Sequence, residues 1–167
     1  ADARTTLRRI DTSITELAPT LQRLRDAWQA RKLDEAQRRQ DLQRLRDALK
    51  RRLEEMATTI AADFGHRSRE ESVIADGMTV LNDIDHLIKH LRRWMKPSRV
   101  GVGWRFLPAR AQLRPSPVGV VGVIAPWNYP VNLSLIPLAT AIAAGNHVYL
   151  KPSEHTPRTS AFLRALL

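Results

Sequence analysis

Residues 118–154 have the sequence VGVVGVIAPWNYPVNLSLIPLATAIAAGNHVYLKPSE, in which two β-rich runs flank a helical one. The first run, 118–125, is rich in Val and lacks polar alternation, which is typical of a strand covered on both faces. Residues 131–145 favour a helix that ends at Gly145, and residues 147–151 favour a second strand. This order predicts a right-handed βαβ unit of a parallel sheet.

Each predicted strand is followed by a turn with polar side chains. Asn128 lies in a turn between Pro126 and Pro130 after the first strand, and Glu154 follows the second strand. Because ligands of parallel sheets bind at the carboxyl ends of the strands, we expect both turns to open onto one site. Taken alone, Asn128 could equally be a turn residue or a helix cap. Glu154 could equally belong to a solvated ion pair.

The stretch from Pro115 to Leu150 contains no Asp, Glu, Lys or Arg, which raises a transmembrane alternative. A membrane-spanning helix needs about 20 continuous apolar residues, however. Pro126, Pro130 and Pro137 divide this stretch into shorter pieces. We therefore expect no membrane partner and a soluble, cytoplasmic protein.

Steps of three and four between apolar residues predict helices upstream of this stretch. The predicted helices cover residues 21–28, 34–64 and 70–95. The first is expected to begin after Pro19, while Gly65 and Pro97 are expected to end the other two. Downstream, Thr156 and Pro157 are expected to cap and open a last helix.

Residues 100–118 contain short alternating segments interrupted by prolines, which predict a projecting β-hairpin arm. The chain is thus divided into a helical segment at 1–99, an arm at 100–118 and a sheet-forming segment at 119–167.

The chain of 167 residues has a formal charge of +10 and a pI near 11.1, which raises the question of an anionic partner. In the helical segment, however, basic and acidic residues alternate, as on a solvated helix face. Aromatic residues make up only 5 % of the chain, so stacking on bases has little support. We expect no nucleic acid partner. The alternative is a basic helical module that binds nucleic acid or a partner helix without catalysis.

Cysteine is absent from the sequence, which excludes a disulfide, a thiolate metal site and a cysteine nucleophile within these residues. His86 and His90 lie one helical turn apart, a spacing that can hold a metal ion. No third ligand beyond Asp83 is evident, and we predict no metal site.

Residues 116–160 resemble the first βαβ unit of the aldehyde dehydrogenase superfamily, through PWNYP, AAGN and KPSE in the same order with compatible spacing. Upstream, IAADFGHRSREE (60–71), DIDHLIKHLRRWMKP (83–97) and FLPARAQL (106–113) resemble the coniferyl aldehyde dehydrogenase branch, close to the class 3 enzymes. The resemblance implies an α/β fold. This chain would supply the N-terminal helices and the first βαβ unit of a Rossmann-like parallel sheet, as an incomplete domain and about the first third of such an enzyme.

The resemblance also implies roles for residues of both turns. Asn128 matches the family residue whose amide donates to the oxyanion of the intermediate, a contribution of about 3–4 kcal/mol. Lys151 and Glu154 match the pair that contacts the adenosine ribose, where Glu154 should repel a 2′-phosphate and favour NAD, with NADP possible. The other residues expected to line the cofactor cleft are Ile124, Ala125, Pro126, Trp127 and Ser153.

The implied activity is the NAD(P)-dependent oxidation of an aldehyde, coniferyl or another aromatic one, to the carboxylic acid. In the family the reaction passes through a cysteine thiohemiacetal, so the nucleophile must lie outside this chain. We expect the 167 residues alone to be inactive. Members of the family associate through the strand arm and helices, so the resemblance implies that the full-length enzyme is a homodimer.

Overall fold

In the computed structural model, which describes residues 13–167, strands β3 (Val120–Ile124) and β4 (His147–Lys151) pair in parallel. Helix α6 (Asn132–Ala143) connects them. The predicted βαβ unit is confirmed, and the chain has the α/β fold. The first twelve residues of the predicted segment 1–99 lie outside the described part.

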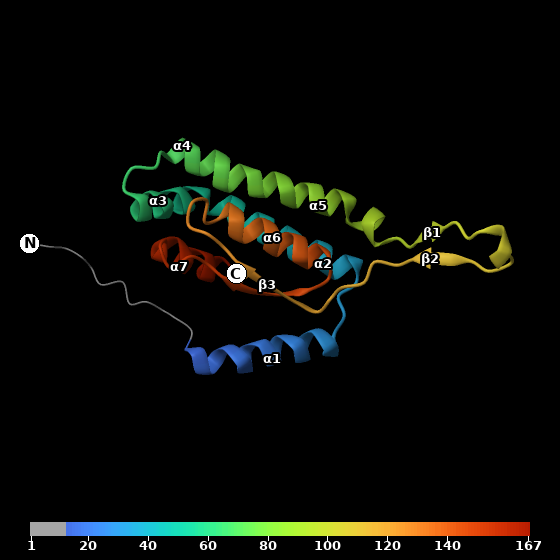
Figure 1. The fold of residues 1–167 in the computed structure, drawn as a ribbon. Helices are drawn as coiled ribbons and strands as arrows, with labels where there is room; N and C mark the ends of the chain where they lie inside the picture. Colours follow the sequence, from blue (N-terminus) through green and yellow to red (C-terminus); the bar gives the residue numbers. More distant parts are fainter. Residues whose placement is uncertain (1–12) are drawn as a thin grey trace, which may run out of the picture.

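The paired strands lie between two helical layers (Figure 1). Helix α1 (Ile14–Ala30) contacts both strands on one face, and its Trp28 indole N–H donates to the Gly145 carbonyl. Helix α6 covers the other face. It packs in turn on α2 (Glu35–Arg51) and α5 (Thr79–Met95).

The hydrophobic core lies between α6 and the N-terminal helices. Its most deeply buried side chains are Leu42, Leu49, Met56, Ile60, Val80, Ile84, Leu91, Val131, Leu135 and Leu163. In β3, Val123 is buried, but Gly122 and Ile124 are exposed. The prediction of a strand covered on both faces is therefore wrong for the second half of β3, where the described helices leave one face open.

Two helix boundaries differ from the prediction. Helix α1 begins at Ile14 with Ser13 as its N-cap, so Pro19 lies inside the helix and does not start it. A proline inside a helix lacks one N–H, and here the helix tolerates that loss. The predicted helix at 34–64 is divided at Arg52, whose φ of −116° interrupts it between α2 and α3 (Leu53–Phe64).

The predicted helix at 70–95 is confirmed as a continuous helical run with an internal change of pitch. It consists of α4 (Arg69–Glu71), a π-helical segment at Ser72–Met78, and α5. A Cβ on Gly77 would lie 2.6 Å from the Leu53 side chain, so glycine permits the close approach of α3. The π-helical segment also places Asp76 in the interior.

Strands β1 (Ser98–Val100) and β2 (Ala111–Leu113) form the predicted arm, an antiparallel hairpin that projects from the body (Figure 1). A 3₁₀ turn, Trp104–Phe106, lies between the two strands. The arm begins at Ser98, two residues before the predicted boundary.

The C-terminal end of α6 is stabilised by a buried cation from α2. Arg38 is 8 % exposed, and its guanidinium donates to the Ala143 carbonyl at 3.2 Å and to the Leu33 carbonyl at 3.0 Å. A positive group at this end complements the helix dipole. Helix α6, in a stretch without charges of its own, is thus held by a charge from another helix.

Candidate functional site

The last pair of the β3–β4 ladder brings the two predicted turns to one edge of the sheet. Ile124 is the register partner of Lys151, and the Ala125 N–H donates to the Lys151 carbonyl at 3.0 Å. The Asn128 turn and the Glu154 turn therefore start from neighbouring positions. The expectation that both turns open at the same carboxyl edge is confirmed.

Asn128 is exposed near the tip of its turn, between the exposed Trp127 and the half-buried Tyr129. Among residues 13–167, no hydrogen bond engages the Asn128 side chain, so its amide remains able to donate to a ligand. Pro130 and Val131, directly after it, are buried. The turn thus presents an accessible amide, and the residues directly after it are anchored in the interior.

Asp76 caps the helix that follows this turn. Its side chain is fully buried, and Oδ1 accepts hydrogen bonds from the N–H groups of Val131 at 3.0 Å and Asn132 at 2.9 Å. A carboxylate at a helix N-terminus satisfies free N–H groups and complements the helix dipole. The alternative that Asn128 caps this helix is therefore wrong, because Asp76 occupies that position.

Arg67 lies beside Asp76 and supports the same turn. Its Nη1 is 3.7 Å from Asp76 Oδ2, and its guanidinium carbon lies 4.0 Å from the Phe64 ring centre and 4.9 Å from that of Tyr129. The Trp127 and Phe64 ring centres are 6.1 Å apart. The turn therefore packs on the end of α3 through Trp127 and on Arg67, just after α3, through Tyr129.

The pKa of Asp76 is raised, mainly by burial, which disfavours the charged form. The N–H donors of Asn132 and Val131 and the nearby Arg67 oppose this effect. Our sequence interpretation missed Asp76. The sequence did contain a signal for it. Asp76 lies three positions after Val73 and four before Val80, which puts a carboxylate on the apolar face of the predicted helix.

Lys151 and Glu154 form an exposed ion pair at the second turn, with Lys151 Nζ 2.5 Å from Glu154 Oε2. Their side chains are 59 % and 49 % exposed, so both remain accessible to a ligand. The hydrogen bond from Lys151 lowers the pKa of Glu154 to about 2. The site therefore presents a carboxylate that is ionised at any physiological pH.

Ser153, in the same turn, is buried, and its Oγ accepts a hydrogen bond from the His155 N–H at 3.2 Å. Its carbonyl accepts from the Ser160 hydroxyl at 3.0 Å. In this structure Ser153 stabilises the turn from inside.

Helix α7 (Pro157–Leu166) starts with Pro157 as predicted, but Thr156 does not cap it with its side chain. Within the described part of the chain, the buried Thr156 hydroxyl has no hydrogen-bond partner. Asp63, from α3, caps this helix instead. Its Oδ1 accepts from the Arg158 N–H at 3.1 Å, and its Oδ2 accepts from the Thr159 N–H and hydroxyl, both at 2.8 Å.

The remaining predicted cofactor residues lie at the end of β3 and directly after it. Ile124 is 81 % exposed and Trp127 is 52 % exposed, while Pro126 is also at the surface. Ala125 is buried, and its N–H is bonded to the Lys151 carbonyl. Ile124, Pro126 and Trp127 thus offer exposed apolar groups near the Lys151–Glu154 pair.

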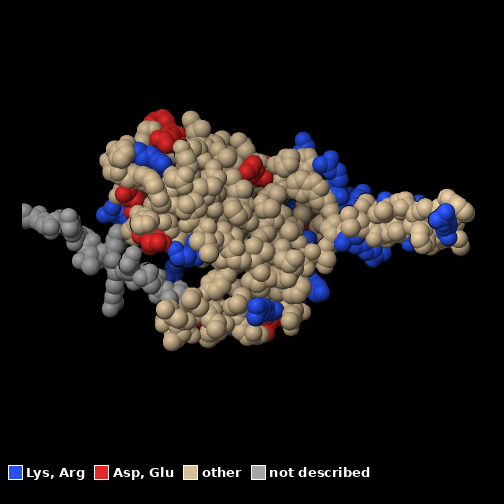
Figure 2. All heavy atoms as spheres, viewed as in Figure 1, with Lys and Arg blue, Asp and Glu red and all other residues tan. Residues whose placement is uncertain are grey.

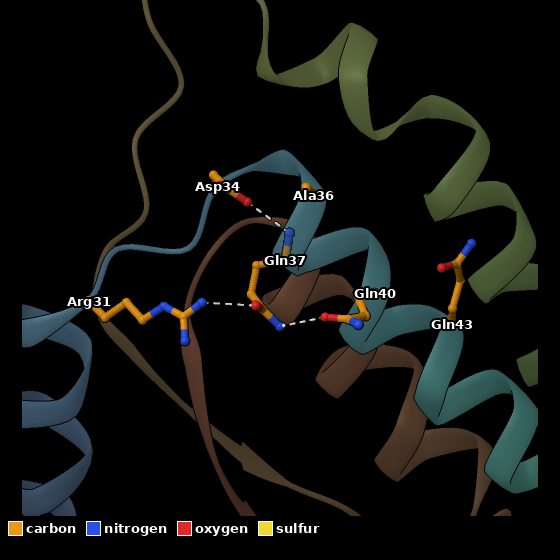
Figure 3. A pocket seen from close by; sticks show the side chains of 6 residues that line it. All are labelled: Arg31, Asp34, Ala36, Gln37, Gln40 and Gln43. Atoms are coloured by element: carbon orange, nitrogen blue, oxygen red, sulfur yellow. Dashed lines mark hydrogen bonds between the residues drawn. The ribbon is translucent and has the colours of Figure 1, made fainter.

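A polar depression lies elsewhere, where α1 meets α2 (Figure 3). There Arg31 donates to Gln37 at 3.0 Å, and Asp34 accepts from the Gln37 N–H at 2.8 Å. Its polar groups largely satisfy one another. The start of α2 contacts the end of α6 through Arg38, so this depression lies toward the amino end of β4, away from the two turns.

His86 and His90 have tilted rings with centres 4.1 Å apart, and His90 stacks on the half-exposed Trp94 of α5. Within residues 13–167, no group of three or more His, Asp or Glu side chains could hold a metal ion.

The positive charge is dispersed over the surface. In Figure 2, blue groups lie along the arm and in separate places on the body, with red groups among those of the body. Several arginines are paired, including Arg46 with Asp85, Arg52 with Glu55 and Arg69 with Glu54. None of the helices in the described residues combines the length and the apolar character needed to cross a bilayer.

Three comparisons relate this chain to known proteins. It is 44 % identical over 155 residues to a probable coniferyl aldehyde dehydrogenase of Pseudomonas aeruginosa, covering 92 % of this chain and 33 % of that protein. It is 38 % identical over 160 residues to mouse aldehyde dehydrogenase family 3 member B3, covering 95 % of this chain and 33 % of that protein. The chain thus spans about a third of the length of these relatives.

Among solved structures, the substrate-bound state of Staphylococcus aureus AldH superposes with a TM-score of 0.87 at 27 % identity, covering 93 % of this chain and 34 % of that one. Succinic semialdehyde dehydrogenase from Streptococcus pyogenes, solved with NADP⁺, has the same fold with a TM-score of 0.82 at 20 % identity, covering 93 % and 33 %. The βαβ unit is therefore part of an incomplete domain. The family model for the aldehyde dehydrogenase family matches residues 13–167, and the chain belongs to that family.

Proposed function

We propose that this chain supplies the oxyanion-stabilising amide and part of the nucleotide site of an NAD(P)-dependent enzyme that oxidises an aldehyde to the carboxylic acid. In this proposal Asn128 is the amide donor. Lys151 and Glu154 contact the adenosine ribose. A cysteine outside this chain attacks the aldehyde carbon and forms a thiohemiacetal.

The observation that carries the proposal is the last register pair of the sheet, Ile124 with Lys151. It starts the Asn128 turn and the Glu154 turn from adjacent positions, so both turns leave the sheet at the same carboxyl edge. This edge is where α/β sheets bind nucleotides. The depression at the α1–α2 junction lacks this relation to the strand ends.

The residues at the edge fit a nicotinamide dinucleotide. The Glu154 carboxylate can accept two ribose hydroxyls, and the Lys151 ammonium can donate. The exposed faces of Ile124 and Trp127 offer apolar contact to the cofactor. When bound, the cofactor would take up the hydride from the thiohemiacetal carbon.

Asn128 would stabilise negative charge on the former aldehyde oxygen. A neutral amide donates a hydrogen bond and has no proton to lose at neutral pH, so it stabilises the oxyanion without protonating it. No other hydrogen bond of residues 13–167 competes for this amide, and the prolines on both sides of the turn reduce its freedom before reaction.

For the substrate we propose an aromatic aldehyde such as coniferyl aldehyde. The support is the 44 % identity to the Pseudomonas aeruginosa relative with that name. We further propose that the enzyme is a homodimer joined through the arm, since Trp104, Phe106 and Leu107 are 77 %, 68 % and 69 % exposed. A cytoplasmic location stays a prediction, which cell fractionation would test.

The substitution Asn128→Ala in the full-length enzyme tests the proposed function. We expect kcat to fall about 10²–10³-fold, as for the loss of one oxyanion donor. The dissociation constant for NAD should change little. The matched control is Asn82→Ala, which removes an exposed amide from α5, away from the strand ends, and should leave kcat unchanged. Unchanged turnover in Asn128→Ala would remove the proposed role.

A further inference from the structure

We propose that Asp76 and Asp63 are positioning residues, one for each turn of the site: Asp76 holds the Asn128 turn and Asp63 holds the Lys151–Glu154 turn. This inference rests on the proposed function. It concerns two carboxylates that lie in the N-terminal helical segment, outside both turns.

The two carboxylates make equivalent contacts. Each caps the helix that directly follows one turn, α6 for Asp76 and α7 for Asp63. Neither α6 nor α7 receives a hydrogen bond from its own N-cap side chain. The start of each helix, and with it the end of each turn, is therefore fixed by a group from a different part of the chain.

The contacts of Asp76 reach close to the amide. Oδ1 binds the N–H groups of residues 131 and 132, only three and four positions after Asn128. The Asn132 side chain adds a second anchor by donating to the Ala75 carbonyl at 2.7 Å. Ser134 donates to the Pro130 carbonyl at 2.5 Å from inside the helix. The segment between Pro130 and Ser134 is thus held by hydrogen bonds to Ala75 and Asp76 and by one between its two ends.

Arg67 supports Asp76 and the turn together. It faces Asp76 Oδ2 at 3.7 Å and lies against the Tyr129 ring, next to Asn128 in the sequence. Loss of the Asp76 carboxylate would free two N–H groups and leave the Arg67 cation without this neighbour in the interior. An oxyanion donor that shifts by about 1 Å can lose about 100-fold in rate.

Asp63 makes three hydrogen bonds at the start of α7, to the backbone N–H groups of Arg158 and Thr159 and to the Thr159 hydroxyl. The Arg158 side chain returns to the Ala62 carbonyl, which adds a second link to α3. Glu154 lies four positions before Arg158. The placement of its carboxylate therefore depends on where α7 begins.

Alanine substitutions of Asp76 and Asp63 should affect different kinetic parameters of the full-length enzyme. We expect Asp76→Ala to lower kcat about 10–100-fold with little change in the KM for NAD. We expect Asp63→Ala to raise the KM for NAD about tenfold with a smaller effect on kcat. If the two aspartates were only structural, both variants would show the same loss of active enzyme and no split between kcat and KM.

Asp76→Asn and Asp63→Asn are the conservative variants. Asp76→Asn keeps the one oxygen that both N–H groups of α6 use, so it should recover most of the kcat that the alanine variant loses. Asp63→Asn keeps only one of the two oxygens that α7 uses, so it should recover part of the KM for NAD. Asp85→Ala is the matched control, because it removes an exposed carboxylate that pairs with Arg46 on the outside of the helices. It should leave both parameters unchanged.

The double variant Asp76→Ala/Asn128→Ala tests whether Asp76 acts through the amide. If it does, the double variant should have the kcat of Asn128→Ala alone, because a missing donor cannot be displaced further. Losses that multiply would overturn the inference. An Asn128→Ala enzyme with normal kcat would instead overturn the proposed function.

Amide hydrogen exchange gives a readout independent of activity. Asp76→Ala should speed exchange in residues 126–132 and not in residues 152–160, while Asp63→Ala should do the reverse. Equal exchange changes in both turns, or in neither, would contradict the assignment of one carboxylate to each turn. This holds whether or not Asn128 serves the proposed reaction.

Discussion

The Arg38 guanidinium packs directly against Gly145, so that a Cβ on this glycine would overlap it. The guanidinium cannot easily move away, because it is buried and bonded to two carbonyls at the ends of α6 and of the α1–α2 connection. Gly145 also has a φ of +87°, which side chains of L residues rarely adopt. Two independent constraints thus require glycine where α6 turns toward β4.

Gly145→Ala in the full-length enzyme should lower stability through both constraints. The left-handed backbone costs about 1–2 kcal/mol for a residue with a Cβ, and overpacking against Arg38 adds about 1–3 kcal/mol. The control is Gly65→Ala, since Gly65 has a φ of +77° and open space around its missing Cβ. Thermal unfolding should show the larger fall in Tm for Gly145→Ala. Equal falls in Tm would mean that the Arg38 side chain moves away from the new Cβ at no cost in stability.

The strands and helix ends that depend on residues close in the sequence could be predicted from local pattern. The Val-rich run before Pro126, the glycine at 145 and the proline at 157 act within a few residues, so they predicted β3, the end of α6 and the start of α7. The turns that contain Asn128 and Glu154 were predicted at the carboxyl edge of the sheet for the same reason, because each turn directly follows a strand.

The capping groups could not be predicted in this way. Asp76 and Asp63 reach α6 and α7 across more than 50 and more than 90 positions of the sequence. No local pattern fixes such a contact, and Thr156 offered an equally good local cap. The interruption at Arg52 was also missed, because the apolar spacing continues through it without a break.

Glu154→Gln should improve the use of NADP relative to NAD. The pKa of Glu154 is about 2, so its carboxylate is ionised throughout the working pH range and would repel a 2′-phosphate. We expect the ratio of kcat/KM for NADP over NAD to rise about tenfold, measured at constant ionic strength. This corresponds to about 1.4 kcal/mol.

Glu54→Gln is the control for that ratio. Glu54 is an exposed carboxylate that pairs with Arg69, so the substitution makes the same change in net charge on a different helix. Its cofactor ratio should equal that of the wild type. If Glu154→Gln gave the same ratio as well, the ribose contact would have to be assigned to another residue.

The raised pKa of Asp76 predicts a pH dependence of stability. Because burial raises the pKa in the folded state above its usual value of 3.8, the folded state binds more protons than the unfolded state just above that value. The contribution of Asp76 to the free energy of unfolding is therefore greatest at low pH and decreases as pH rises through the folded-state pKa. Glu154 acts in the opposite direction, since its lowered pKa gives stability that is lost as pH falls below about 4.5.

Comparison with Asp76→Asn isolates this effect, since the variant has no proton to release at this position. The free energy of unfolding of the wild type minus that of Asp76→Asn should fall as pH rises above 3.8, the usual Asp value, and become constant once pH exceeds the raised folded-state pKa. Denaturant titrations at half-unit intervals up to pH 8 would measure it. A difference that grows with pH would show that ionised Asp76 stabilises the fold more than burial disfavours it.

The exposed apolar tip of the arm predicts how the protein assembles. Trp104 and Phe106 are among its most exposed large side chains, on a hairpin that makes few contacts with the body (Figure 1). Aromatic side chains of this kind commonly dominate the stability of an interface. Trp104→Ser and Phe106→Ser should each weaken dimerisation of the full-length enzyme about tenfold or more, as measured by sedimentation equilibrium. Leu17→Ser, on the outside of α1, should leave the dimer unchanged, and a wild-type dimer insensitive to both arm substitutions would place the interface on another surface.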